Sequence, residues 1–310
     1  MAEAAAPPRP ILLAGPTASG KSALALAMAE RLGGEIVNAD SQQVWADWRV
    51  VSARPSRADE ARVPHHLYGH RDGAQRYSAG DWLREAEGVL GDIAARGRRA
   101  IICGGTGLYF TALTEGLSTI PPIPDSIRAE VDRARQSHDA PAFAALLAAE
   151  DPETAERIDR ANPARVARAL EVIRATGRSL TSWQAETGAP RVTHAVTIAL
   201  MPDPKGLDAR IADRFRAMVA GGALEEAAVV ARRALPHGAG ALKPLGASEL
   251  IAHVEGRLSL DEAIARATLA TRRYAKRQRT WIRGRMKGWT HLPTPAPLGA
   301  LAVIRATEGT

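Results

Sequence analysis

The stretch Gly15-Pro16-Thr17-Ala18-Ser19-Gly20-Lys21-Ser22 decides the fold, because it fits the pattern Gly-x-x-x-x-Gly-Lys-Ser/Thr at every fixed position. The apolar run before it predicts a buried strand, and the alanine- and leucine-rich run 23–32 after it predicts a helix. Together they form a phosphate cradle. We expect the backbone N–H groups of residues 17–22 to point inward, Lys21 to add a positive charge, and Ser22 to hold Mg²⁺.

Two further predicted strands end in polar side chains. Residues 35–39 lead into Asp40, and residues 99–103 lead into Gly104-Gly105-Thr106. In an open parallel sheet, ligands bind at the carboxyl ends of the strands, so we expect Asp40 and Thr106 to lie on the same edge as the phosphate loop. A turn or helix-cap role is the alternative for Asp40. The sequence therefore predicts an α/β fold, a parallel sheet flanked by helices like that of the P-loop NTPases.

The chain of 310 residues changes character after the Pro-rich stretch 119–124. Residues 122–189 show helix patterns and no strand pattern, which predicts a small all-helical insert. We expect residues 11–121 and 190–295 to form the catalytic core, residues 1–10 a disordered lead-in and residues 296–310 a C-terminal tail. The core should regain a strand within 192–200. The helices expected in the insert are 125–136, 140–149, 152–160 and 163–175, and those expected after it are 205–219, 222–234, 246–254 and 261–283.

Composition narrows the cellular setting. The net charge is +7, which favours a polyanionic partner. We find no apolar run long enough to span a membrane and no signal-peptide pattern, and the single cysteine, Cys103, fits a reducing compartment. We therefore expect a cytoplasmic protein without a membrane partner. Cys103 lies in an apolar run and should be a core residue. The adjacent His65 and His66 should point to opposite sides, so we expect no shared metal.

The last long predicted helix is strongly basic. Residues 271–290 contain no acidic residue, and Tyr274, Trp281 and Trp289 are interleaved with the cations. Cations and aromatic side chains in this arrangement are typical of surfaces that bind a nucleic-acid backbone. A solvated helix face is the alternative. The cations are Arg272, Arg273, Lys276, Arg277, Arg279, Arg283, Arg285 and Lys287.

Taken in order, the motifs of the chain resemble those of one enzyme family. They are Gly15–Ser22, Asp40-Ser41-Gln42, Pro64-His65-His66-Leu67, Tyr77-Ser78-Ala79, Gly104–Tyr109, Asn162–Glu171 and Thr271–Trp281. From about residue 10 to residue 290 the chain resembles the bacterial tRNA dimethylallyltransferases, isopentenyl transferases that modify adenosine 37 beside the anticodon. The phosphate loop is shared by many nucleotide-binding proteins, whereas the late Ala-Lys-Arg-Gln-x-Thr-Trp run is specific.

The resemblance changes the ligand that we expect on the phosphate loop. It implies that residues 15–22 bind the diphosphate of dimethylallyl diphosphate, with Mg²⁺ on Ser22, and that the acceptor is the N6 amine of adenine. Asp40 would be the general base, and Thr106 would orient the amine or a diphosphate oxygen. The implied partners are tRNAs that read codons beginning with U, bound through the anticodon stem-loop to a monomeric enzyme.

The resemblance also implies the RNA contacts. The target base must leave the stacked anticodon loop, so we expect a tunnel through the core, with the insert closing over the RNA. Ala164 stands where the family usually has glutamine, and Gly246-Ala247-Ser248 departs from its usual Gly-Tyr-Arg or Gly-Tyr-Lys. The residues expected to contact tRNA are Asp40, Ser41, Gln42, Gln43, Thr106, Arg128, Ala164, Arg165, Val166, Ala167, Arg168, Arg272, Lys276, Arg277 and Arg279.

Three other functions fit parts of the sequence. A small-molecule kinase would also place an aspartate after the second strand, but it leaves the basic helix unexplained. An enzyme that prenylates free AMP or ADP would not need the helical insert. An RNA-binding protein could use the loop only as a nucleotide switch, although Lys21, Ser22, Asp40 and Thr106 together favour catalysis. Phosphate release from ATP would indicate the kinase, and prenylation of AMP the free-nucleotide enzyme.

Overall fold

The computed structural model of the protein describes residues 7–236 and 238–308. The chain forms two compact units, one built from the segments up to Ala112 and from Val192 onwards, the other from Leu113–Arg191. The helical unit therefore begins earlier than the expected residue 122. Most of the lead-in, residues 1–6, lies outside the described residues, and Pro10 already accepts a hydrogen bond from Val196 N.

The first unit contains a six-stranded sheet in the order β3-β2-β4-β1-β5-β6, and every pair is parallel. The strands predicted near 11–14, 35–39, 99–103 and 192–200 are confirmed. The edge strands β3 and β6 were not predicted, because two or three residues are too few to show a periodicity. The bounds are β1 Ile11–Ala14, β2 Gly34–Asn38, β3 His65–His66, β4 Arg99–Gly104, β5 Val196–Leu200 and β6 Thr290–Leu292.

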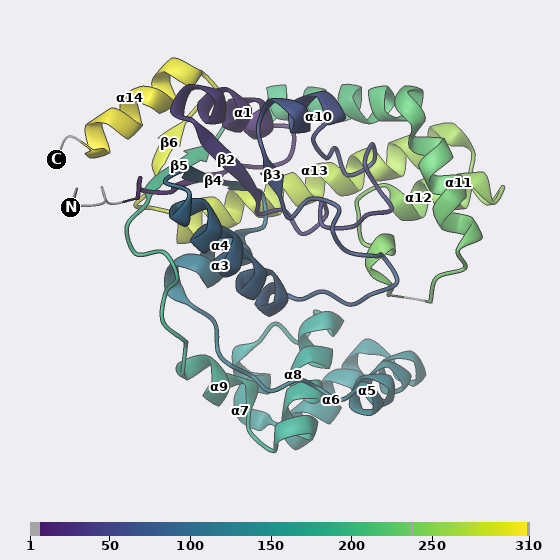
Figure 1. The fold of residues 1–310 in the computed structure, drawn as a ribbon. Helices are drawn as coiled ribbons and strands as arrows, with labels where there is room; N and C mark the ends of the chain where they lie inside the picture. The colour runs from purple at the N-terminus through teal and green to yellow at the C-terminus, as the bar shows by residue number, and fades with distance from the viewer. Residues whose placement is uncertain (1–6, 237, 309–310) are drawn as a thin grey trace. The chain divides into compact units, whose positions relative to one another are not determined.

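Helices cover both faces of the sheet (Figure 1). The connection from β1 to β2 carries α1 (Lys21–Leu32), and the connection from β3 to β4 carries α3 (Ala79–Ala95). These two connections run in opposite directions along the sheet, and right-handed crossovers therefore place α1 and α3 on opposite faces. The strands are accordingly buried on both sides, and Cys103 lies in the core as expected.

The remaining helices of this unit pack around the carboxyl end of the sheet. A π-helical turn with Gly222 at φ 106° separates α10 from α11. The expected tail forms α14, whose Ala300 and Ile304 are buried in the core that also holds α1; residues 309–310 lie outside the described residues. The bounds are α2 Arg57–Arg62, α4 Gly107–Glu115, α10 Pro204–Met218, α11 Leu224–Arg232, α12 Ala247–Val254, α13 Leu260–Arg285 and α14 Pro297–Glu308.

The second unit is all-helical within its described residues, as the sequence predicts. Its core contains Val131, Phe143, Leu147 and Leu170. Several helices begin at a capping Asp or Asn followed within two residues by proline, a sequence signal that places their starts accurately. The short α9 was not predicted. The bounds are α5 Asp125–Ser137, α6 Ala140–Glu150, α7 Pro152–Arg157, α8 Pro163–Thr176 and α9 Leu180–Ala185.

Local contacts explain the positions of the two histidines and the start of α3. His66 pairs with Glu35, with 2.7 Å between Nε2 and Oε2, while His65 Nδ1 lies 2.9 Å from Val63 O, so the two histidines have separate structural partners. Ser78 caps α3 in a capping box with Asp81. Among the residues that the structure describes, no helix has both the length and the apolar character needed to cross a membrane.

Candidate functional site

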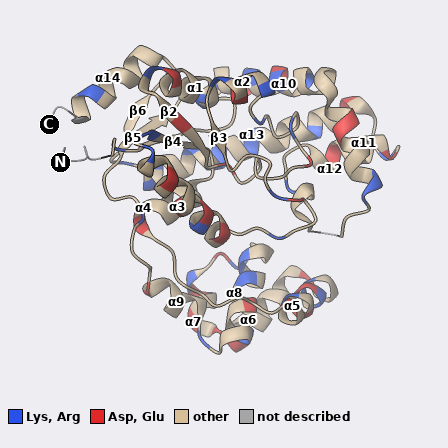
Figure 2. Cartoon of the chain, in the orientation of Figure 1, with Lys and Arg blue, Asp and Glu red and all other residues tan. Residues whose placement is uncertain are grey.

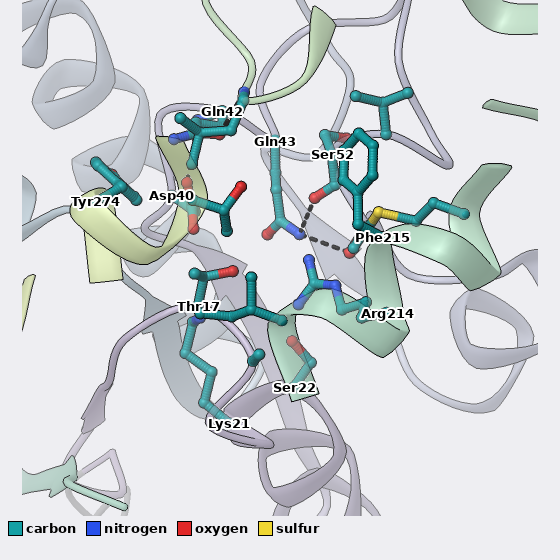
Figure 3. Close-up of a pocket in the computed structure, with 17 residues that line it drawn as sticks. Thr17, Lys21, Ser22, Asp40, Gln42, Gln43, Ser52, Arg214, Phe215 and Tyr274 are labelled. Carbon is teal, nitrogen blue, oxygen red and sulfur yellow. Dashed lines mark hydrogen bonds between the residues drawn. The ribbon is translucent and has the colours of Figure 1, made fainter. Parts of the chain in front are cut away.

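A pocket lies at the carboxyl edge of the sheet, next to the phosphate loop (Figure 3). The loop between β1 and α1 supplies Thr17, the first two residues of α1 supply Lys21 and Ser22, and the turn after β2 supplies Asp40 and Gln43. The sequence therefore identified two sides of the pocket. Its other sides come from the loop 51–53, from α10 and from α13. The full lining is Thr17, Ala18, Lys21, Ser22, Asp40, Gln42, Gln43, Val51, Ser52, Ala53, Ile211, Arg214, Phe215, Met218, Leu245, Thr271 and Tyr274.

The phosphate loop adopts the turn that its glycine pattern requires. Gly20 has φ 88° and precedes α1, and Ala18 has φ 60°. Two backbone N–H groups depart from the expected inward orientation, because Thr17 N donates to Gln278 Oε1 (2.9 Å) and Ser19 N donates to Pro16 O (3.2 Å). The prediction for residues 17–22 was therefore wrong at these two groups. The groups of this loop that are left for an anion are therefore its remaining N–H groups and the Lys21 ammonium.

The pocket carries more positive than negative charge. Lys21 is only 8% exposed, and burial lowers its pKa, an effect that the nearby Asp40 carboxylate partly offsets. Arg214, from α10, also faces this pocket and forms no ion pair or hydrogen bond with another described residue. Burial lowers its pKa too, again partly offset by Asp40. One buried and one half-buried cation with one carboxylate create a site that favours a polyanion.

Asp40 is held with one carboxylate oxygen left free. Its backbone N–H donates to Asn38 Oδ1 (2.8 Å), and its Oδ1 accepts from Gln42 N (3.1 Å). Asp40 is 8% exposed and has no ion-pair partner among the described residues. The alternative of a turn role for Asp40 is confirmed, because its Oδ1 accepts from Gln42 N two residues on, and Asp40 caps no described helix. Its Oδ2 remains available to accept a proton in the pocket.

Thr106 lies next to Asp40, as its place after β4 predicts. Its hydroxyl accepts from Ser41 N (2.8 Å) and donates to Ser41 Oγ (3.1 Å), and its N–H donates to Ala39 O (3.1 Å). These bonds connect the end of β4 to the turn after β2. Thr106 therefore fixes the position of the Asp40 turn, and its hydroxyl also interacts with the side chain of Tyr274, which lines the same pocket.

Gln43 has a defined orientation. Its Nε2 donates to Ser52 O (3.0 Å) and to Ala53 O (2.7 Å), and because both partners are acceptors, its Oε1 must be the atom that is left for a ligand (Figure 3). Beside it the pocket wall is apolar. The apolar residues are Val51, Ile211, Phe215, Met218 and Leu245.

The residues present suit a magnesium ion that is held mainly by a phosphate ligand. Among the described residues there is no group of three or more His, Cys, Asp or Glu side chains arranged to hold a metal. Mg²⁺ commonly keeps several waters and takes only one or two protein oxygens in addition to substrate phosphates. The Ser22 hydroxyl lines the pocket and forms no hydrogen bond to a described residue, so it fits this donor set.

Helix α13 carries the expected run of Lys and Arg (Figure 2), but these cations have different surroundings. Lys276 and Arg277 are exposed and border an apolar groove with Trp281 and Arg285. Arg272 instead donates to Asp208 O on α10, and Arg279 is half-buried with its Nε unpartnered. The structure thus groups two of the four predicted α13 cations on one face and adds Arg285.

The predicted RNA-binding residues of the helical unit are also divided. Arg128 Nη1 and Arg168 Nη1 each lie 3.6 Å from Glu171 Oε2, and Arg128 Nε lies 4.0 Å from Asp125 Oδ1, so two carboxylates accompany the two cations. Burial lowers the pKa of Arg168. Val166 and Ala167 are buried in the core of this unit, so any contact of these two residues with RNA would come from the backbone, and their role stays a prediction. Ala164 and Arg165 are exposed.

Comparison with known proteins supports a family assignment. The sequence model of the family described as IPP transferase matches residues 43–285, and that of isopentenyl transferase matches residues 9–67. The chain belongs to the IPP transferase family. A tRNA dimethylallyltransferase of Cereibacter sphaeroides is 53% identical over 292 residues, which cover 93% of this chain and 90% of the relative. One of Dinoroseobacter shibae is 53% identical over 290 residues, covering 92% and 95%.

Solved structures of this transferase family share the fold. The tRNA isopentenylpyrophosphate transferase of Bacillus halodurans aligns with a TM-score of 0.69 and 29% identity over 97% of this chain and 96% of the other. A eukaryotic dimethylallyltransferase acting on tRNA aligns with a TM-score of 0.75 and 26% identity, covering 97% and 77%. The predicted parallel sheet of the P-loop type, flanked by helices, is confirmed.

Sequence reasoning missed several residues of this IPP transferase pocket, and two of them, Arg214 and Tyr274, have ionisable side chains. Arg214 was placed only within a predicted helix, and Tyr274 was treated only as an aromatic residue of the basic run. Tyr274 lines the pocket, and burial together with Asp40 raises its pKa to about 12. Arg210, one helical turn before Arg214, donates to Ala18 O, so this face of α10 is turned to the phosphate loop by a tertiary contact that leaves no signal in the sequence.

Proposed function

We propose that the protein transfers the dimethylallyl group of dimethylallyl diphosphate to N6 of adenosine 37 in tRNA. One observation carries the proposal: a single pocket presents the buried cation Lys21 and the half-buried cation Arg214 beside the free carboxylate oxygen of Asp40 and an apolar wall. Cations suit a diphosphate, an apolar wall suits a five-carbon tail, and a carboxylate suits proton removal from an amine. The names of the relatives supply the tRNA acceptor.

The diphosphate would lie on the phosphate loop. There the N–H groups at the start of α1, together with Lys21 and Arg214, neutralise charge that grows as the leaving group departs. The allylic C–O bond breaks, and its electron pair goes to the diphosphate oxygen. Mg²⁺ bound at Ser22 would supply further neutralisation of that charge.

The acceptor amine would lie near Asp40. A bond forms between N6 and the allylic carbon, and the N6 proton passes to Asp40 Oδ2, the carboxylate oxygen without a described hydrogen-bond partner. Gln43 Oε1 faces the same space and can accept the second N6 hydrogen. Thr106 holds the Asp40 turn through Ser41, so the base keeps its position during attack.

The apolar wall gives the prenyl tail a place that excludes water. Phe215 and Met218 come from α10, Val51 from the loop after β2 and Leu245 from the segment before α12, so the wall is built from three separate segments. Exclusion of water matters because an ionising allylic carbon reacts with any nearby nucleophile. The donor would therefore lie with its charged end on the loop and its tail along this wall.

The tRNA would use the two basic clusters. The groove of α13 offers Lys276, Arg277 and Arg285 around the Trp281 ring, a combination suited to phosphates and an unstacked base. The helical insert offers Arg165 together with the Arg128–Arg168 pair. Contact of Ser41, Gln42, Arg272 and Arg279 with RNA, the preference for tRNAs that read codons beginning with U, a monomeric state and a cytoplasmic location stay predictions.

The test is direct. Pure protein is incubated with dimethylallyl diphosphate, Mg²⁺ and an unmodified tRNA transcript, and the nucleosides are analysed by mass spectrometry. A gain of one C5H8 unit on adenosine 37 is expected, with none on AMP. A C5H8 gain on AMP but not on tRNA would indicate an enzyme that prenylates free nucleotides. No gain on either acceptor would contradict the proposal.

A further inference from the structure

Gln278 on α13 connects two loops that are far from it in sequence. Its Oε1 accepts a hydrogen bond from Thr17 N in the phosphate loop (2.9 Å), and its Nε2 donates to Gly105 O in the loop after β4 (2.8 Å). The side chain is 5% exposed, so both polar ends of the amide are used inside the protein. Because the backbone N–H of Thr17 can only donate and the carbonyl oxygen of Gly105 can only accept, the opposite orientation of the Gln278 amide would break both hydrogen bonds.

The loop after β4 is shaped to receive this amide. A Cβ atom on Gly105 would lie 2.1 Å from Gln278 Nε2, and a Cβ atom on Gly107 would lie 2.2 Å from the Trp281 ring. Both glycines are thus required by side chains of α13, not by a positive φ. Residues 278 and 281 lie one turn apart on the helix, so a single face of α13 contacts both glycines.

The two connected loops serve opposite halves of the proposed reaction. The phosphate loop would hold the departing diphosphate, and the loop after β4 carries Thr106, whose hydroxyl holds the Asp40 turn. The structure gives one other direct link between these loops, a hydrogen bond of 3.3 Å from Gly15 N to Gly104 O at the base of the strands. The bridge through Gln278 lies farther out, where the loops extend beyond the sheet.

Resting on the proposed function, we infer that Gln278 is a positioning residue that fixes the donor-binding loop relative to the acceptor-activating loop. An error of about 1 Å between reacting groups can reduce a rate about 100-fold, so a bridge of this kind acts on the transfer step. Gln278 itself does not contact the reacting atoms in this proposal. Methionine has a similar length but neither donor nor acceptor at these positions, and alanine vacates the space beside Gly105.

The experiment measures single-turnover transfer, per active site, with both substrates saturating. Gln278→Met should lower the rate constant about 10- to 100-fold while each KM changes less than about threefold. Arg283→Met, an exposed change on the same helix, is the matched control and should leave both unchanged. A loss of folded protein alone would reduce the number of active sites without changing the rate per site.

A double-mutant cycle tests the contact itself. Gly105→Ala should slow transfer, because its Cβ displaces the glutamine amide. In the Gln278→Ala background the space is vacant, so Gly105→Ala should add little further loss. If the rate losses of Gln278→Ala and Gly105→Ala multiply in the double variant, the two residues act independently and the inference is overturned. It is overturned equally if Gln278→Met transfers at a rate within about twofold of that of the unmodified enzyme.

Hydrogen exchange separates this inference from the proposed function. In Gln278→Met, peptides covering residues 16–22 and 104–107 should both exchange faster, whatever reaction the enzyme catalyses. An inactive unmodified protein would contradict the proposed function alone, and the exchange result would still decide the bridge. Unchanged exchange in both peptides would refute the bridge even in an active enzyme.

Discussion

Replacing Arg214 with methionine gives the sharpest test of the pocket. Arg214 is a half-buried cation that faces the phosphate loop and forms no ion pair or hydrogen bond with another described residue. It would gain its partner only when an anion binds. Methionine keeps much of the side-chain volume and removes the charge, so the change isolates the electrostatic contribution.

The expected magnitude follows from this geometry. A hydrogen bond to a charged group contributes about 1.5–3 kcal/mol, and each 1.4 kcal/mol is tenfold in affinity, so Kd for inorganic diphosphate should rise roughly 10- to 150-fold. The ligand-free protein should lose no thermal stability. Arg214 is one cause of the lowered pKa of Lys21, and its removal relieves repulsion between the two cations.

Isothermal titration with diphosphate at fixed pH and ionic strength gives the affinity, and thermal melting of the ligand-free protein gives the stability. Arg216→Met is the matched control, since Arg216 is exposed on the same helix and pairs with Asp213 at 3.3 Å. The reasoning fails if Arg214→Met binds diphosphate within about twofold of the unmodified protein. It fails equally if Arg216→Met weakens binding to the same extent.

Asp40→Asn should lower single-turnover transfer about 100- to 10,000-fold with tRNA affinity nearly unchanged, and a retained rate would remove Asp40 as the base. Arg277→Gln should reduce the slope of log tRNA affinity against log salt concentration by about 1, whereas Arg283→Gln should leave this slope unchanged. Equal changes of slope in both variants would indicate general electrostatic attraction and no specific phosphate contact by Arg277. Glu226 accepts hydrogen bonds from three consecutive backbone N–H groups beside the pocket, so Glu226→Ala should lower the free energy of unfolding by about 2 kcal/mol. A decrease of less than about 0.5 kcal/mol, measured by denaturant titration, would contradict this. Burial raises the pKa of the Cys103 thiol from 9.0 to about 12, so a disulfide reagent at pH 8 should label Cys103 only after the protein unfolds. Above pH 9 the thiol ionises in the unfolded protein before it does so in the folded one, so this group lowers the free energy of unfolding as pH rises. Fast labelling of the native protein would refute the assignment of Cys103 to the core.

Local features of the fold were readable from the sequence. The strand, glycine loop and helix from residue 11 to residue 32 follow from apolar runs and from a glycine that must adopt a left-handed conformation at residue 20. Asp40 and Thr106 could be placed together because strand order does not change the edge at which parallel strands end. Helix starts at residues 139, 151 and 162 were readable from their capping side chains.

The tertiary structure alone decided which helix residues reach the pocket. Arg214, Tyr274 and Gln278 lie on helices whose core-facing side is set by packing around residues distant in sequence, and Gln278 finds its partners 261 and 173 residues away. The division of α13, with Arg277 in a groove and Arg279 half-buried, arose in the same way. The sequence by itself determined the elements, the phosphate loop and the rim residues that follow the strands, because short-range sterics and periodicity control them. Helix rotation and loop-to-loop bridges depend on long-range contacts, which have no local signature.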